Sequence, residues 1–268
     1  MAGVVLAAGI GSRLAPLTWQ RPKALCPVGG APLVDHALGH LRALGLPAAV
    51  NAHHHAAAVE AHVAGRAHVS VEDRLLGTAG ALGRLRPWLD GRAAVVLNAD
   101  AVHAADLSRL LRGWDGATVR LLVADPPGTE FGPRLRLCGA LMPWADVASL
   151  PAEPAGLYDQ VWKPAAAAGR LDVLAGTVAW FDCGTPRAYL AANLWVSGGR
   201  SVIGEGSRVE GRIVRTVVWP GSVVHRQERL VDAIRAGRTT VLVRDRGRPF
   251  EARRRSTDQP RPSSPTAS

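Results

Sequence analysis

Short apolar runs alternate with helix-like stretches through the first half of this 268-residue chain. Each apolar run is too short to be a helix and is typical of a buried strand. The expected strands span residues 4–8, 48–52, 68–72, 93–98 and 118–124, and the expected helices span residues 33–44, 56–64, 80–85 and 105–112. This alternation predicts a doubly wound, mainly parallel α/β sheet with helices on both faces. Ligands of such sheets bind at the carboxyl ends of the strands.

The turn after the first expected strand is rich in glycine and is followed by two cations. Gly9 and Gly11 allow the backbone to turn tightly and to approach a ligand closely. Successive N–H groups in such a turn form a concavity for phosphate oxygens, and Arg13 and Lys23 add positive charge beside it. The turn fits neither a complete dinucleotide fingerprint nor a P-loop. It predicts a polyphosphate ligand such as a nucleotide, although the glycine pair alone also suits an ordinary strand-to-helix turn.

Four motifs then occur in a fixed order. They are Leu6-Ala7-Ala8-Gly9-x-Gly11-Ser12-Arg13-Leu14 with Pro22-Lys23, Leu76-Gly77-Thr78-Ala79-Gly80, Asn98-Ala99-Asp100 and Trp180-Phe181-Asp182-Cys183-Gly184-Thr185-Pro186. Together they resemble the signature of the sugar-1-phosphate nucleotidylyltransferases over roughly residues 3–195. The resemblance implies a Rossmann-like sheet and an enzyme that joins a nucleoside triphosphate to a sugar 1-phosphate and releases pyrophosphate. The overall layout implies GDP-mannose or a similar NDP-sugar as the product.

Asp100 and Asp182 are the metal ligands that the resemblance implies. Each follows an apolar strand, so both are expected at one edge of the sheet. Mg²⁺ is usually held by one or two carboxylates together with substrate phosphates, and we expect Mg²⁺ as the cofactor. Each aspartate by itself could also be an ordinary strand-end or capping carboxylate.

Arg13 and Lys23 are the expected catalytic residues. Arg13 should contact the β- and γ-phosphates and stabilise the leaving pyrophosphate, and Lys23 should lie against the α-phosphate or the sugar phosphate. Lys23 is one of only two lysines among 32 basic residues. The alternative for both is surface solvation, the usual state of basic side chains.

The family's nucleotide and sugar contacts map onto further residues. The expected nucleotide-binding residues are Leu6, Ala7, Ala8, Gly9, Gly11, Ser12, Gly77, Thr78 and Gly80. As a bare string, the stretch around Thr78 could instead be a helix N-terminus with Thr78 as its cap. The expected sugar-binding residues are Asn98 and Gly139, although Asn98 also suits a turn.

The sugar side departs from the family pattern. Many relatives carry Glu-Lys-Pro shortly before the segment that matches Cys138-Gly139-Ala140, but residues 125–137 contain no lysine here. Lys163 comes after that segment, and Lys163-Pro164 looks like the start of a helix. Either Gly139 and nearby residues hold the sugar differently, or the chain is a catalytically silent, nucleotide-sugar-binding regulatory subunit.

Residues 200–224 show a different periodicity. Aliphatic residues recur at a spacing of roughly six with small turn residues between them, which resembles about one coil of a left-handed parallel β-helix. One coil cannot bury its own face, so it should pack on the catalytic domain or on another subunit of a homo-oligomer. Residues 230–236 are expected to form a short helix and residues 239–243 a strand. The predicted organisation is a catalytic domain (1–197), an appendage (198–243) and a tail (244–268).

The net charge of +10 raises the question of nucleic-acid binding. Much of the excess lies in the Arg-, Pro- and Ser-rich tail, which is expected to be disordered, and no nucleic-acid-binding module is recognisable. The three cysteines are far apart, which argues against a disulfide framework or a CxxC metal site. Without an apolar run of membrane-spanning length or a signal pattern, we expect a cytoplasmic protein that does not bind membranes.

Overall fold

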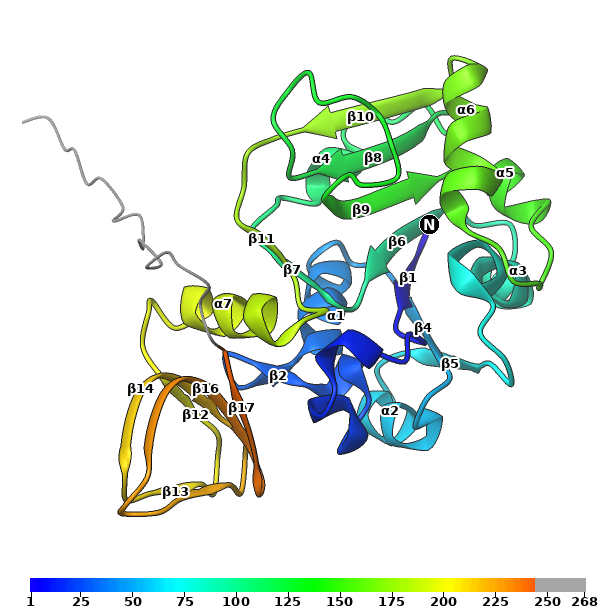
Figure 1. Cartoon of the computed structure of the whole chain (residues 1–268). Helices are drawn as coiled ribbons and strands as arrows, with labels where there is room; N and C mark the ends of the chain where they lie inside the picture. Colours follow the sequence, from blue (N-terminus) through cyan, green and yellow to red (C-terminus); the bar gives the residue numbers. More distant parts are fainter. Residues whose placement is uncertain (244–268) are drawn as a thin grey trace, which may run out of the picture.

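The computed structural model describes residues 1–243 and centres on a seven-stranded sheet (Figure 1). The strands lie in the order β10 (Leu171–Ala175), β8 (Val119–Val123), β9 (Leu137–Met142), β6 (Ala94–Asn98), β1 (Ala2–Leu6), β4 (Ala48–Ala52) and β5 (His68–Val71). All neighbours are parallel except β9, which runs antiparallel to both β6 and β8. The mainly parallel α/β sheet predicted from the alternation is therefore confirmed.

Helices cover both faces of this sheet. One face carries α1 (Leu33–Ala43), α2 (Ala56–Val63) and α4 (Ser108–Leu111), and the other carries α3 (Gly77–Leu89), α5 (Trp144–Ala148), the π-helical turn η4 (Tyr158–Trp162) and α6 (Lys163–Ala167). Successive residues of a strand point to opposite faces. In β1, Val5 accordingly packs into the first core and Val4 into the second, and both are fully buried.

Short elements fill the carboxyl edge of the sheet. Three 3₁₀ turns, η1 (Ser12–Leu14), η2 (Leu17–Trp19) and η3 (Lys23–Leu25), lead from β1 to the hairpin β2 (Pro27–Val28) and β3 (Ala31–Pro32). A separate antiparallel pair joins β7 (Ala101–His103) to β11 (Trp180–Asp182). Helix α7 (Pro186–Val196) follows, with Pro186 in its first turn and the Thr185 hydroxyl accepting a hydrogen bond from the Ala188 N–H (3.3 Å).

The last described strands form a separate, smaller body beside α7 (Figure 1). Strands β12 (Val202–Ile203), β14 (Arg212–Val218) and β16 (Arg229–Ala236) pair in parallel, β17 (Thr239–Leu242) is antiparallel to β16, and β13 (Arg208–Val209) pairs in parallel with β15 (Val223–Val224). The helix expected at residues 230–236 is wrong, because pairing on both sides holds this segment as β16 and overrides its local preference. The expected final strand is confirmed, whereas the left-handed hexapeptide coil stays a prediction.

A third apolar core joins these strands to the rest of the chain. It contains the buried residues Leu14, Leu17, Cys26, Val28, Leu33, Val102, Cys183, Tyr189, Leu190, Ala192, Leu194, Val217, Trp219, Ile234 and Ala236. Residues from the turns after β1, from the β7–β11 pair, from α7 and from the C-terminal strands thus bury one another. Within residues 1–243, none of the helices is long and apolar enough to cross a bilayer. The tail predicted for residues 244–268 lies outside the described residues.

Candidate active site

The pairing of β7 with β11 places the two predicted carboxylates side by side. Asp182 lies opposite Ala101, and the Cys183 N–H donates to the Asp100 carbonyl (2.9 Å). Both side chains converge on Lys23, whose Nζ lies 2.5 Å from Asp100 Oδ2 and 3.8 Å from Asp182 Oδ1. Three charged residues that are far apart in the sequence therefore meet at the carboxyl edge of the sheet.

Arg13 approaches the same group from the turn after β1. Its Nη2 lies 3.5 Å from Asp182 Oδ2, and its side chain is 67% exposed, so the guanidinium is free to contact a ligand. Gly184 makes this approach possible, because a Cβ at Gly184 would lie 2.8 Å from both Arg13 Nη2 and Asp182 Oδ1. The Gly184 N–H also donates to Asp182 Oδ1 (2.9 Å). Gly184 is thus a site residue that the sequence analysis quoted only as part of a motif.

A pocket of about 380 Å³ opens beside Lys23. The predicted site residues among its lining are Leu6, Ala7, Ala8, Gly9, Lys23, Gly77, Thr78, Asn98 and Asp100. Its volume is typical of a small-molecule site. Lys23 and Asp100 line the pocket together with Gly77 and Thr78 from the first turn of α3.

The two glycines of the first turn have different surroundings. A Cβ at Gly9 would meet no protein atom within 4 Å, so the bare backbone there faces open space in the pocket. Gly11 has a φ of +70°, and a Cβ there would lie 2.9 Å from Thr18 Cγ2 and 3.0 Å from Lys23 Cβ. Gly11 and its neighbour Ser12 are not part of the pocket lining, and Gly11 instead lets the chain that carries Lys23 pack closely.

The first turn of α3 is held in place by the segment before η4. The Thr78 hydroxyl accepts a hydrogen bond from the Leu157 N–H (2.8 Å), and Thr78 lies in the first helical turn, whereas the N-cap position is Leu76. A Cβ at Gly80 would clash with the Glu153 carbonyl oxygen. The stretch is thus a helix N-terminus, as the alternative held, but Thr78 is not its cap. Gly80 packs against backbone and is not part of the pocket lining.

Two buried polar residues in the pocket wall escaped the sequence analysis. Asn51 Oδ1 accepts from the Ala7 N–H (2.6 Å), and its amide donates to Glu72 Oε1 (2.7 Å). Glu72 Oε2 accepts from the Leu76 N–H (3.0 Å), so this pair links the turn after β1 to the loop before α3. Asn51 and Glu72 are 3% and 2% exposed. The one signal that could have identified Asn51 is its position as a lone polar residue inside the apolar strand β4.

The predicted sugar side is less well assembled. Asn98 ends β6 and lines the pocket. Gly139 is buried in β9, where a Cβ would lie 2.9 Å from Leu97 Cδ2 and 3.2 Å from Leu110 Cδ1, so packing against α4 accounts for the glycine. Lys163 is exposed at the start of α6, and Pro164 lies in the first turn as predicted. Helix α6 leads directly into β10. Neither Gly139 nor Lys163 is part of the pocket lining.

The cysteines near the charged group are chemically quiet. All three cysteines are free and buried. Burial raises the pKa of the Cys26 thiol to about 12, and burial together with the charge of Asp100 raises the pKa of Cys183. A thiol of this kind stays protonated at neutral pH and is a poor nucleophile. Covalent catalysis by these two cysteines is therefore disfavoured.

Comparison with known proteins identifies the family. The family profile described as nucleotidyl transferase matches residues 2–131. The N-acetylmuramate alpha-1-phosphate uridylyltransferase of Caulobacter vibrioides is 32% identical over 70% of this chain and 94% of its own length. The chain belongs to the nucleotidyl transferase family. The resemblance seen in the motifs is thus confirmed.

Two further comparisons of this nucleotidyl transferase are with proteins named for sugar 1-phosphates. The mannose-1-phosphate guanylyltransferase of Mycobacterium tuberculosis is 33% identical over 40% of this chain and 32% of its own length. A solved structure from Thermus thermophilus, described as a mannose-1-phosphate geranyltransferase, shares the fold with a TM-score of 0.66, 20% identity and coverage of 90% of this chain and 94% of its own. That coverage extends into the C-terminal strands.

The two carboxylates of this nucleotidyl transferase suit a hard divalent cation. Their side chains are 39% and 40% exposed, and both already face one positive charge, the Lys23 ammonium. Among the described residues, no group of three or more His, Cys, Asp or Glu side chains has the arrangement of a metal site. Two carboxylates without further protein ligands match the way Mg²⁺ is held in sites where substrate phosphates complete its coordination. Asp100 and Asp182 therefore fit such an ion.

Proposed function

We propose that this chain transfers a nucleotidyl group from a nucleoside triphosphate to a sugar 1-phosphate, forming an NDP-sugar and pyrophosphate. The convergence of Arg13, Asp100 and Asp182 around Lys23, which lines the pocket together with Asp100, is the observation that carries the proposal. In this reaction an oxygen of the sugar phosphate attacks the α-phosphorus and forms a new P–O bond. The bond from the α-phosphorus to the bridging oxygen breaks, and pyrophosphate leaves with the electron pair.

The chain's own residues then act by position and charge. Such transfers depend on alignment and on neutralising negative charge more than on covalent chemistry. The Lys23 ammonium, a compact charge on the pocket wall, is placed to meet the α-phosphate or the sugar phosphate. Arg13, which is mostly exposed, can close on the β- and γ-phosphates and stabilise the departing pyrophosphate. Gly9 leaves room for phosphate oxygens against the backbone.

We propose that Asp100 and Asp182 hold Mg²⁺. When bound, the ion would supply Lewis-acid neutralisation of the phosphate charge. The contact from Lys23 holds the carboxylate of Asp100, which lines the pocket, and the Gly184 N–H orients the carboxylate of Asp182. These contacts support the assignment of the two aspartates as a pair rather than as separate capping residues.

The substrate pair is the finer part of the proposal. The layout of the sequence favours a product of the GDP-mannose type. The Caulobacter relative, which is matched over 94% of its own length, makes uridylyl transfer to an N-acetylmuramate-type sugar phosphate the second candidate. Each candidate predicts a different base and a different sugar, so one substrate matrix separates them.

A pyrophosphate-release assay with four nucleoside triphosphates and a panel of sugar 1-phosphates, with and without Mg²⁺, tests the proposal. We expect Mg²⁺-dependent turnover with at least one pair. Binding of nucleotide-sugars without turnover of any pair would overturn it and support a silent regulatory subunit. The lysine-free loop between β8 and β9 favours that alternative, whereas the charged group around Lys23 favours the enzyme.

We also propose that residues 1–197 form the catalytic domain and residues 198–243 an appendage. The protein is further proposed to be cytoplasmic and to form a homo-oligomer. Nucleic-acid binding through residues 245–268 would require an affinity that falls steeply with salt and disappears when those residues are deleted.

A further inference from the structure

The segment that carries Lys23 is attached to the C-terminal strands at its beginning. We call residues 19–28 the lysine loop. The Gln20 side-chain amide donates to the Ala236 carbonyl (3.1 Å) and to the Thr239 hydroxyl (3.0 Å). The Arg21 guanidinium lies 4.5 Å from the centre of the Trp219 ring, within the range of a cation–π interaction. Two consecutive residues just before Lys23 thus contact the C-terminal body.

The end of the lysine loop is held by a buried chain of hydrogen bonds. Trp219 Nε1 donates to the Tyr189 hydroxyl (2.9 Å), which donates to the Pro27 carbonyl. Beside it, Asn193 Oδ1 accepts from the Gly29 N–H (3.0 Å). Trp219 is 1% exposed, and Tyr189 and Asn193 are fully buried. Removing one partner from such a chain leaves a buried polar group without its hydrogen bond, which costs more than the bond itself contributes.

The C-terminal strands also pack against the backbone segments that carry Lys23, Asp100 and Asp182. Trp219 and Ile234 belong to one apolar core with Cys26, Val102 and Cys183. These three lie close in sequence to Lys23, Asp100 and Asp182, respectively. The backbone on which each charged side chain is mounted therefore packs on residues from the last 50 described positions.

We infer that the C-terminal strands and α7 together position Lys23, with Trp219 and Tyr189 as the positioning residues. The turn η3 spans three residues, and such a short 3₁₀ piece does not hold its own conformation. A displacement of about 1 Å at a reacting group can cost about 10²-fold in rate. The inference rests on the proposed function for its catalytic consequence, and the position of Lys23 itself can be measured without activity.

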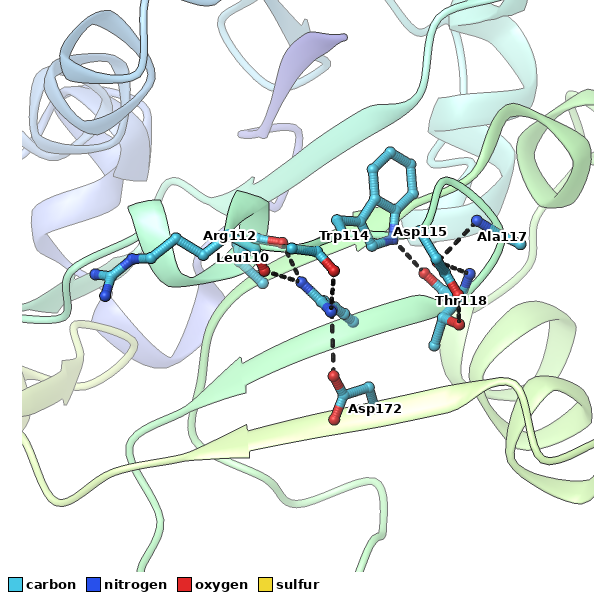
Figure 2. A network of polar contacts seen from close by, with 9 residues as sticks. Leu110, Arg112, Trp114, Asp115, Ala117, Thr118 and Asp172 are labelled. Atoms are coloured by element: carbon cyan, nitrogen blue, oxygen red, sulfur yellow. Dashed lines mark hydrogen bonds and ion pairs between the residues drawn. The ribbon is translucent and has the colours of Figure 1, made fainter.

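Trp219→Phe is the sharpest variant, because it removes the indole N–H and keeps an aromatic ring under Arg21. Trp114→Phe is its matched control. Trp114 Nε1 donates to the Thr118 carbonyl (2.7 Å) in a polar network near α4 and β8 (Figure 2), so its hydrogen-bond partner lies four positions along the chain and not in the lysine loop. We expect Trp219→Phe to lower kcat about tenfold to 10²-fold, with the KM for the nucleotide within about threefold, and Trp114→Phe to leave kcat unchanged.

Tyr189→Phe should lower kcat in the same way, because it cuts the chain at its middle member. The double variant Trp219→Phe/Tyr189→Phe should fall no further than Tyr189→Phe alone, since both changes interrupt one path. Urea unfolding of each variant at the assay temperature establishes that the protein assayed is folded.

Lysine NMR gives the readout that does not depend on activity. The chain contains two lysines, so protein labelled with ¹⁵N at the lysine Nζ should give two ammonium signals. Lys163→Arg assigns the one that remains to Lys23. We expect Trp219→Phe to shift or broaden the Lys23 signal and Trp114→Phe to leave it in place. An unmoved Lys23 signal overturns the inference, as does a kcat equal to that of the control. If the wild type turns over no substrate pair, the proposed function fails and the Lys23 signal alone decides.

Discussion

The corner between α4 and β8 and the edge that carries Lys23 are both rich in charge, but they use it differently. In the corner, Asp115 accepts hydrogen bonds from the Ala117 N–H (2.9 Å) and from the Thr118 N–H (2.8 Å) and hydroxyl (2.5 Å) (Figure 2). Arg120 donates to three carbonyls between residues 110 and 113, and its Nε lies 3.1 Å from Asp172 Oδ2. These contacts give both side chains several protein partners, most of which are close in sequence.

At the edge, the partners come from distant parts of the chain and the carboxylates are shared. Asp100 and Asp182 face one ammonium, and each side chain keeps about two-fifths of its surface exposed. Exposure alone does not distinguish the two regions, since the side chain of Asp172 in the corner is 41% exposed. What separates them is that two carboxylates from distant segments of the chain share one ammonium at the edge.

The largest effect should come from Asp182→Asn compared with Asp115→Asn. Asp182→Asn should lower kcat by about 10³-fold, because it removes charge that acts at the reacting phosphates, while the half-exposed side chain leaves the free energy of unfolding little changed. Asp115→Asn should leave kcat unchanged and lower the urea midpoint, because its amide group would face donors. Steady-state kinetics and urea unfolding of both variants give the answer, and equal kcat values would erase the distinction.

Acid should weaken the edge before the corner. Burial and the nearby His40 lower the pKa of His103, on β7, to about 4. The folded state favours the neutral imidazole, whereas the unfolded chain takes up a proton below pH 6.5. The contribution of His103 to the free energy of unfolding is therefore complete above pH 6.5 and is lost as the pH falls from 6.5 to 4. The expected loss is about 3 kcal/mol. Hydrogen bonds from Thr118 and Ala117 lower the pKa of Asp115 to about 2, so its contribution is lost only between pH 3.8 and 2.

Urea unfolding of the wild type and of His103→Asn at pH 7 and pH 4 measures this difference. His103→Asn should be less stable at pH 7, because it disturbs the contact of His103 Nε2 with the Cys138 carbonyl (3.0 Å), but it should lose less stability on acidification. Parallel loss in both proteins would show that other groups cause the acid sensitivity.

Gly80→Ala tests whether Gly80, in the first turn of α3, is required for packing. The new Cβ would clash with the Glu153 carbonyl oxygen, so the backbones must separate, and we expect a loss of about 1–3 kcal/mol. Gly39→Ala in α1 is the control, since no atom lies within 4 Å of its Cβ position, and it should stabilise by about 0.5–1 kcal/mol. Both values follow from urea unfolding, and a fully stable Gly80→Ala protein would show that packing against Glu153 does not require the glycine.

The alternation of strands and helices was sufficient to predict the five parallel strands β1, β4, β5, β6 and β8, because burial on both faces leaves a pattern in each segment. It did not extend to β9 and β10, and it could not reveal that β9 runs antiparallel, since strand direction depends on the path of the connection. The segment that forms β16 was predicted as a helix because its pairing with β14 and β17 is invisible to a local window.

The site was predictable to the extent that a motif carries it. Arg13, Lys23, Asp100 and Asp182 stand in motifs, and the fold brings them together. Asn51, Glu72 and Trp219 were missed. The side chains of Asn51 and Trp219 act through partners that are 21 or more positions away, and Glu72 joins distant Asn51 to the nearby Leu76 N–H. Long-range hydrogen bonds of this kind have no sequence spacing that could announce them.

The smallest effect, and the finest test of the edge, is Gly9→Ala compared with Gly11→Ala. Gly9 has an ordinary φ and open space at its Cβ position, so alanine should leave the free energy of unfolding within about 0.5 kcal/mol of the wild type. If phosphate oxygens approach this backbone, the KM for the nucleotide should rise about tenfold, which corresponds to about 1.4 kcal/mol. Gly11→Ala should have the opposite effects, because Gly11 serves the turn. It should leave the KM for the nucleotide unchanged and lose about 1 kcal/mol of stability through the positive φ at this position. Titration with nucleotide and urea unfolding separate the two, and a Gly9→Ala protein with unchanged KM would place the phosphates elsewhere along the pocket.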